Sequence, residues 1–256
     1  KAGSVQGLGL AGLRADRMPV LPGGIAIMSA VFEELGIEHM TYADGALRLG
    51  VLYDLLGRVH HRDMRDATVD QFMRRYQVDA RQAERIERTA GHILLQLLGK
   101  PQTPDQESDF QFLSWAAKLH EIGISVAHNG YHKHGAYILT FADMPGFSKK
   151  DQARLALLVF GHRGKLEKIT ALPTGDPHWK LLCALRLATL FHRSRDGVSL
   201  PPFRLRALAD GFLLELQNDW LAMHPLTAVA LSEEIAAWQR VGQVLSVKHR
   251  NLERDA

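Results

Sequence analysis

Cysteine is almost absent from this chain: Cys183 is the single one in 256 residues. An internal disulfide framework is therefore excluded, and a reducing cytosol is the expected compartment, with peripheral membrane association as an alternative. Cys183 lies in the apolar helical pattern KLLCALRLA, where a buried thiol is inert. No stretch approaches the roughly 20 apolar residues of a membrane helix, and no secretory signal is visible. An integral membrane segment is not expected.

Two further absences exclude classes of function. The sequence holds neither a P-loop nor a G-x-S-x-G motif, and it shows no catalytic constellation of the nucleophile type. Aromatic residues make up 7% of the chain and do not alternate with its basic clusters, as base stacking in single-strand binders requires. No nucleic-acid partner is therefore expected. The net charge of +3 is too small to identify an anionic partner, so only local clusters of basic residues can indicate one.

At 256 residues, two or three compact units are expected. The chain starts without methionine in the glycine-rich segment KAGSVQGLGLAGLRADRMPVLPGG, which we interpret as the continuation of something longer. A short apolar run, two glycines and a helix from about Ile25 to Leu35 predict the end of an α/β unit. A short strand at 40–42 and a helix closed by Gly57 are expected to follow.

From His60 onward the pattern becomes helical, and an all-α domain is expected over residues 60–196. The predicted helices cover residues 68–76, 80–98, 109–121, 134–140, 149–160 and 177–193. Asp79 and Ser148 are the expected N-caps of two of them. Past Pro201 and Pro202 the period changes again. Two strands around a turn at 209–211, a helix at 226–241 and a strand at 243–248 predict a small α+β module over residues 200–256.

Three residues at helical positions resemble the ligand pattern of HD-type metal centres, which use a His, a later His-Asp pair and a distant Asp. His92 and His120 fill the first two positions, Glu121 replaces the Asp, and Thr189 stands where the last acid is expected. Such a set would bind a hard cation poorly. His92, His120 and Glu121 are therefore interpreted as degenerate positions without a functional metal. The alternative for His120 is a histidine hydrogen-bonded in the helical core.

Basic and imidazole side chains gather at three helix ends or loops. Cationic donors in such places suit a multiply charged phosphate ligand, so we predict substrate-binding residues there, against the alternative of scattered solvated charges. The predicted residues are His132, Lys133 and His134 in a loop, His162, Arg163 and Lys165 after a helix, and Arg193 and Arg195 near the last helix end. A second phosphate contact is predicted at the N-terminal side. There Arg14 and Arg17 precede Gly23 and Gly24, whose N–H groups would lie at a positive helix end.

Several segments together resemble the C-terminal half of the exopolyphosphatase and guanosine pentaphosphate phosphohydrolase family. They are GLRADRMPVLPGGIAI, ADGALRLGVLYDLLGR, WAAKLHEIGI, YHKHGAYIL, DMPGF and LLCALRLATLFHRSR, and the similarity runs to about residue 200 and more loosely beyond it. The resemblance implies a mainly α fold in three parts. These are the C-terminal part of a second actin-like (ribonuclease H-like) α/β domain at 1–57, an HD-like helical domain at 60–196 and an α+β module at 200–256.

The resemblance also implies an activity. The family hydrolyses terminal phosphates of inorganic polyphosphate, or the 5′ phosphate of guanosine pentaphosphate, using Mg²⁺ and usually as a homodimer. Its catalytic glutamate and phosphate loops belong to the half that precedes these segments, so no residue here inherits a catalytic role, and this chain alone is expected to be inactive and to bind no Mg²⁺.

His132, His134, His162 and Arg163 match the polyphosphate-degrading branch, so we expect part of an exopolyphosphatase whose helical domain holds the polyphosphate chain in a basic channel. The alternatives are a guanosine pentaphosphate phosphohydrolase, a metal-dependent HD phosphohydrolase and a non-catalytic dimerisation module.

Overall fold

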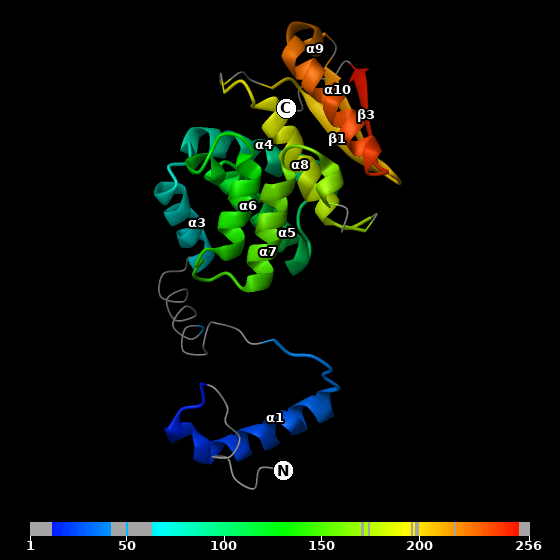
Figure 1. Cartoon of the computed structure of the whole chain (residues 1–256). Helices are drawn as coiled ribbons and strands as arrows, with labels where there is room; N and C mark the ends of the chain where they lie inside the picture. The colour runs from blue at the N-terminus through cyan, green and yellow to red at the C-terminus, as the bar shows by residue number, and fades with distance from the viewer. Residues whose placement is uncertain are drawn as a thin grey trace. The chain divides into compact units, whose positions relative to one another are not determined.

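The computed structural model describes residues 12–41, 50, 63–169, 172–173, 175–195, 197, 200–217 and 219–250. Contacts divide the chain into two compact units, residues 1–50 and 51–256. The described residues are mostly helical and include one small sheet, as the sequence predicts (Figure 1).

The first unit contains the 3₁₀ helix η2 (Ala15–Val20) followed directly by helix α1 (Leu21–Leu35). The short apolar run before the two glycines is therefore helical and does not form the strand that the end of an α/β unit would place there. A proline at the start of α1 presets a helical φ, so the helix begins at Leu21 and takes both glycines into its first turns. Gly36, at φ 60°, ends it. The strand predicted at 40–42 does not form at Met40, and Tyr42 and the helix ending at Gly57 lie outside the described residues.

Helix α1 is unusually exposed for an apolar helix. Ile27 and Leu35 are 67% and 70% exposed. By length and composition alone the 21-residue stretch Ala15–Leu35, with a mean hydropathy of 1.3, is apolar enough to cross a membrane. The prediction that no stretch approaches that composition is therefore wrong. Core helices of soluble proteins and signal sequences meet the same criterion, which makes it weak support for a membrane span.

The second unit begins with a helical bundle. Its members are α3 (Met64–Arg75), α4 (Ala80–Leu98), α5 (Pro104–Leu119), η3 (Ile122–Ser125), α6 (Tyr131–Phe141), α7 (Lys149–Gly161), η4 (Leu166–Ile169) and α8 (His178–Phe191). The predicted caps are confirmed: the Asp79 side chain accepts from the first turn of α4, and Ser148 and Asp151 form a capping box on α7. Helix α8 is buried along nearly its whole length, because its apolar side chains face α4, α5, α7 and α10.

A small sheet and two helices follow. Strand β1 (Phe203–Leu208) pairs antiparallel with β2 (Gly211–Gln217), which confirms the predicted hairpin, and β3 (Val244–Arg250) pairs parallel with β2. Between them lie the short α9 (Trp220–Met223) and α10 (Pro225–Arg240). Phe212 and Trp238 join the same hydrophobic core as the helices of the bundle. This shared core brings α10 against α8 and η4 (Figure 1).

Two helix boundaries differ from prediction in a way that bears on function. Helix α5 starts five residues early, at Pro104, because Thr103 caps it, and it ends at Leu119, so His120 and Glu121 follow the helix. Helix α6 begins directly after Gly130, whose φ is 68°. His132, Lys133 and His134 therefore lie in the first turn of a helix, and the prediction of a loop at these residues is wrong. The buried Tyr131 side chain anchors that turn to the core.

Candidate ligand-binding pocket

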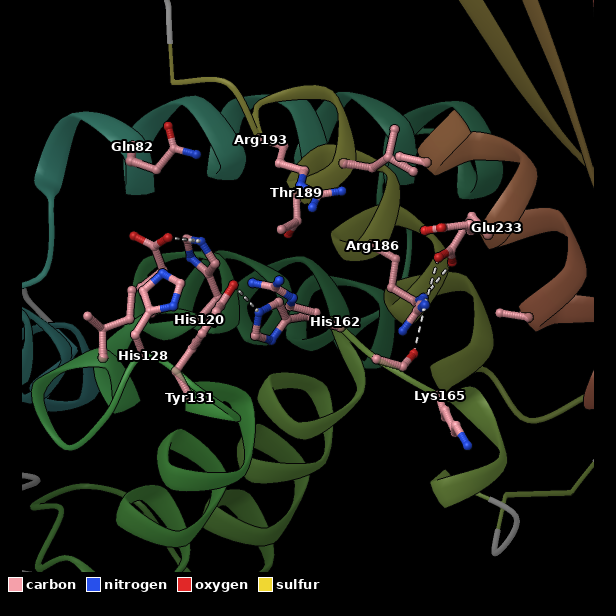
Figure 2. A pocket seen from close by; sticks show the side chains of 18 of the residues that line it. Gln82, His120, His128, Tyr131, His162, Lys165, Arg186, Thr189, Arg193 and Glu233 are labelled. Atoms are coloured by element: carbon pink, nitrogen blue, oxygen red, sulfur yellow. Dashed lines mark hydrogen bonds and ion pairs between the residues drawn. The ribbon is translucent and has the colours of Figure 1, made fainter. Parts of the chain in front are cut away.

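A pocket of about 720 Å³ lies within the second unit, which is within the usual range of roughly 300–1,000 Å³ for ligand sites. It is bounded by the ends of α5, α7 and α8, by η3 and by one face of α10. Its polar lining residues are Gln82, His120, Glu121, His128, Tyr131, His162, Arg163, Lys165, Arg186, Thr189, Arg193, Arg195, Glu233, Glu234 and Arg240. In Figure 2 His120, Tyr131 and His162 lie along one side, and Gln82, Thr189 and Arg193 face them across the cavity.

His120 forms part of the buried wall. It is fully buried, and its Nδ1 lies 2.7 Å from the Ala117 carbonyl oxygen. A carbonyl only accepts, so Nδ1 carries the proton and Nε2 is an acceptor. No partner for Nε2 exists in the described part of the chain, and the nearest carboxylate oxygen, on Glu121, is 3.8 Å away. Burial lowers the pKa of His120, which favours this neutral form.

His162 and Tyr131 continue the same wall. The Nδ1 of His162 donates to the Val159 carbonyl at 2.6 Å, and its Nε2 lies 3.4 Å from the Tyr131 hydroxyl. The rings of His162 and His120 meet edge to face at 5.4 Å. Burial lowers the pKa of His162 well below its usual value, and burial raises the pKa of Tyr131. Both side chains are therefore uncharged at neutral pH.

A buried ion pair forms the opposite end of the pocket. Arg186 donates to both carboxylate oxygens of Glu234, at 2.5 and 2.7 Å, and also to the carbonyls of Gly161 and Gly164. Trp238 donates its indole N–H to Glu234 at 2.7 Å. The bidentate pair joins α8 to α10 and the loop after α7, so it fixes the position of three elements around the cavity (Figure 2).

The rim is strongly cationic. Six arginine and lysine side chains line the pocket against three glutamates. Arg186, Arg195 and Arg240 are paired with carboxylates. Arg163, Lys165 and Arg193 form no ion pair within the described residues, and all three are exposed. The Arg163 guanidinium also lies over the Tyr131 ring, 5.2 Å from its centroid. Cations without a carboxylate partner beside a neutral, partly polar wall are suited to a ligand that carries phosphate at one end and uncharged groups at the other.

Of the predicted degenerate metal positions, His120, Glu121 and Thr189 line the pocket, whereas His92 does not. Glu121 pairs with Arg195, which also contacts Asp79 at 3.1 Å. Thr189 donates to the Leu185 carbonyl. His92 lies elsewhere on α4, against Gln96 and Phe203, and does not line the pocket. In the described ranges no group of three or more His, Cys, Asp or Glu side chains is arranged to hold a metal ion.

The predicted phosphate contacts are brought together only in part. His162, Arg163, Lys165, Arg193 and Arg195 all line the pocket, whereas His132, Lys133 and His134 do not. The His132 ring packs near Phe160 and His162, and burial, with the nearby Lys168 ammonium, lowers its pKa to about 4. Burial also lowers the pKa of Lys168, to about 7, and its ammonium donates to the Arg163 carbonyl.

The N-terminal residues belong to the other unit and are described separately. Arg14 pairs with Asp16 at 3.1 Å on an exposed surface, and Arg17 lies in η2. Gly23 and Gly24 lie in the first turns of α1, and a Cβ at either would meet nothing within 4 Å among the described atoms. Packing in the described part of this unit therefore does not require glycine at either position.

Sequence reasoning missed Tyr131, Arg186 and Glu234. A signal for Arg186 was present, since it is the single charged residue in the otherwise apolar run LLCALRLATLF, and a charge in such a run needs a buried partner. Nothing local marks Glu234 as that partner, 48 residues away. Tyr131 carries no comparable signal, because the histidines that follow it indicate a solvent-facing loop.

Comparison with protein families gives two matches along the chain. Residues 64–235 match the description "Ppx/GppA phosphatase, domain III". Residues 1–59 match "Ppx/GppA phosphatase family". The first match contains most of the pocket, from Gln82 to Glu234.

Curated relatives agree with this. The chain is 39% identical to the "Guanosine-5'-triphosphate,3'-diphosphate pyrophosphatase" of Aeromonas hydrophila over 94% of its length, which covers 49% of that protein. Proteins of the same name in Pseudoalteromonas translucida and Vibrio cholerae are 36% and 33% identical, over 95% and 96% of this chain and 50% of each relative. The chain thus spans about half the length of the curated relatives it matches.

These names correct one prediction. The chain was expected to be part of an exopolyphosphatase, but the relatives that match nearly all of it carry the name of the guanosine pentaphosphate enzyme, which was the alternative. The four residues matched to the polyphosphate-degrading branch, His132, His134, His162 and Arg163, therefore do not identify that branch. At the level of the family the matches agree with the resemblance, and the larger one covers well over half of the residues. The chain belongs to the Ppx/GppA phosphatase family.

Proposed function

We propose that the full-length protein containing this chain hydrolyses the terminal 5′ phosphoanhydride bond of guanosine 5′-triphosphate 3′-diphosphate. Water adds to the terminal phosphorus, the bond to the bridging oxygen breaks, and inorganic phosphate leaves together with guanosine 5′-diphosphate 3′-diphosphate. The observation that carries the proposal is the shared name of relatives that align over 94–96% of this chain.

The pocket supports a substrate-holding role for the described part. Arg163, Lys165 and Arg193 would donate charge-assisted hydrogen bonds to phosphate oxygens. The neutral side chains of His120, Tyr131 and His162 would contact the uncharged part of the ligand. Arg186 is already committed to Glu234 and would hold the wall in place rather than bind the ligand.

Mg²⁺, which the family resemblance implies, does not fit the described residues. Of the three pocket glutamates, Glu121 and Glu234 are neutralised by arginines, which leaves Glu233, and no cluster of three ligands occurs within the described ranges. A hard divalent cation needs several free oxygen ligands. We therefore assign no step of the reaction to a metal held by these residues.

The domain organisation forms part of the same proposal. Residues 1–57 would complete an actin-like α/β domain, residues 60–196 would be the HD-like domain and residues 200–256 a terminal α+β module. The two family matches, which meet between residues 59 and 64, support the first boundary. Self-association of the full-length protein as a homodimer is proposed on the resemblance alone and is checked by light scattering.

Phosphate release by the full-length protein tests the proposed activity. Guanosine 5′-triphosphate 3′-diphosphate and long-chain polyphosphate are compared separately and in competition. The expected result is a kcat/KM for the nucleotide on the order of 100-fold higher, equivalent to about 2.7 kcal/mol of transition-state discrimination. A higher kcat/KM for polyphosphate would overturn the proposal.

A further inference from the structure

His120 lines the pocket and has an unpartnered acceptor atom. Its side chain is 1% exposed, its Nδ1–H is used by the Ala117 carbonyl, and Nε2 has no hydrogen-bond partner in the described structure. Buried polar atoms are nearly always paired, with protein or with ordered water, so an unpaired one at a cavity wall indicates a ligand or water position. Because Nε2 carries no proton in this tautomer, its partner has to be a hydrogen-bond donor.

The surroundings of Nε2 limit what that donor can be. Arg195, the nearest cation, is committed to Glu121 and Asp79, and its guanidinium is therefore not free to pair with His120. The neighbouring His162 uses its Nδ1–H on Val159, and its own Nε2 faces Tyr131. No donor in the described part of the wall reaches His120, so the donor has to come with whatever fills the cavity.

The remainder of the lining selects for anions. Arg163, Lys165 and Arg193 are exposed cations without a carboxylate partner among the described residues. A ligand for this cavity therefore needs phosphate oxygens for the rim and an O–H or N–H group for the buried wall. Internal phosphates of inorganic polyphosphate are fully ionised at neutral pH and offer no donor. Ribose hydroxyls and guanine N–H groups are donors.

We propose that this pocket binds a phosphorylated nucleoside, with a hydroxyl or N–H group of the nucleoside donating to His120 Nε2 and its phosphates bound by Arg163, Lys165 and Arg193. The guanine identity of the nucleoside rests on the proposed function, whereas the need for a donor rests on the geometry of His120. His120 is a specificity residue for the nucleoside and takes no part in breaking the phosphoanhydride bond.

Two probes of similar charge distinguish binding of the nucleoside from binding of phosphate alone. GDP carries donors, and cyclic trimetaphosphate is fully ionised and carries none. Isothermal titration of each into the 256-residue chain at pH 7.5 is expected to show one GDP per chain and a Kd for trimetaphosphate at least tenfold weaker. This comparison needs no variant, so it holds even if a substitution at the buried position prevents folding.

Two substitutions at His120 then locate the contact. His120→Asn places an amide N–H near the position of Nδ1 and can keep the bond to Ala117, but it lacks Nε2. His120→Gln places an amide oxygen near Nε2. We expect H120N to weaken GDP binding about tenfold and to leave trimetaphosphate unchanged, and H120Q to retain most of the affinity for GDP. Arg193→Ala should weaken both probes, and circular dichroism checks that each variant is folded.

Equal affinity for the two probes, absence of GDP binding, or an unchanged GDP affinity in a folded H120N protein would overturn the inference, with water then the partner of Nε2. A different result would overturn the proposed function alone. If the full-length protein releases phosphate from polyphosphate in preference to the nucleotide while GDP still binds through His120, the activity is wrong and the nucleoside pocket remains.

Discussion

The guanidinium of Arg186 on α8 and the carboxylate of Glu234 on α10 form a two-pronged buried ion pair, with their side chains only 5% and 10% exposed. The pair joins a helix of the bundle to a helix of the terminal module and forms one end of the pocket. Its additional bonds to the Gly161 and Gly164 carbonyls and to Trp238 satisfy most of the remaining polar atoms.

Removing one member of this pair should be strongly destabilising. Arg186→Met leaves the Glu234 charge buried without its partner, and we expect a loss of about 3–5 kcal/mol in the free energy of unfolding, measured in urea. Arg240→Met is the matched control, because Arg240 and its partner Glu167 are 50% and 36% exposed, and its effect should stay within about 1 kcal/mol. Equal effects of the two substitutions would contradict the buried role of Arg186.

The unpaired rim cations should determine the affinity for phosphate. In the full-length protein, Arg163→Ala and Arg193→Ala are each expected to raise KM for guanosine 5′-triphosphate 3′-diphosphate on the order of tenfold, the effect of losing one charge-assisted hydrogen bond. Arg74→Ala removes an exposed cation that does not line the pocket, and it serves as the control. A loss that is the same for all three variants would indicate a general effect of net charge.

Burial of two histidines predicts how stability depends on pH. Burial lowers the pKa of His120 and of His162, so the unfolded chain binds protons first as the pH falls. The contribution of the two histidines to the free energy of unfolding should therefore be fully present above about pH 6.5 and decrease below it. His120 faces Glu121, Arg195 and His162. His162 also faces His132 and Lys168, and the Lys168 ammonium opposes its protonation.

Urea midpoints between pH 7.5 and 5 test this dependence. His162→Asn can keep the bond to the Val159 carbonyl while removing the titrating group, so the loss of stability on acidification should become smaller. His249→Gln changes an exposed histidine on β3 and should leave the slope as it is. A slope that does not respond to His162→Asn would place the acid sensitivity elsewhere in the chain.

Gly123 should be irreplaceable for a steric reason. A Cβ at this position would lie 2.0 Å from the Tyr131 carbonyl oxygen and 2.4 Å from the Gly135 nitrogen, so η3 and α6 approach each other only because glycine has no side chain. We expect Gly123→Ala to destabilise the protein by several kcal/mol and to weaken GDP binding, since the shifted α6 carries Tyr131 with it.

At Gly91, in contrast, substitution by alanine is expected to stabilise the protein. It lies inside α4, and a Cβ there would meet nothing within 4 Å among the described atoms outside the helix backbone. Gly91→Ala should therefore raise the free energy of unfolding by about 0.5–1 kcal/mol through the better helix propensity of alanine. Thermal unfolding of the two variants side by side measures both effects, and a tolerated Gly123→Ala would contradict the close packing described for η3 and α6.

The helical part was predictable because its signals are local. Asp79 and Ser148 are caps whose effect is confined to one helical turn, and the periodic apolar residues between caps and glycines marked most of the helices. The start of α5 at Pro104 was missed although Thr103 and Pro104 form a local capping signal. Its end at Leu119 was missed because α5 packs against α4 and α7, which a window along the sequence does not register.

The pocket was predictable only in part, because its charges are paired through space. The sequence predicts Arg163, Lys165 and Arg193 as phosphate contacts; all three line the pocket, and their role as phosphate contacts stays a prediction. Whether a cation is free or neutralised depends on partners far along the chain: Arg195 meets Glu121 across 74 residues, and Arg186 meets Glu234 across 48. No local pattern carries that information.

Arg195 holds Glu121 and Asp79, two carboxylates from different parts of the bundle, through one guanidinium. Its own backbone has a φ of 58°, a left-handed conformation that is uncommon for arginine. A guanidinium is covalently part of the chain, so it cannot diffuse away or be removed by a chelator. The positive charge at this junction is therefore a permanent part of the polypeptide, and its presence does not depend on the ionic composition of the surroundings.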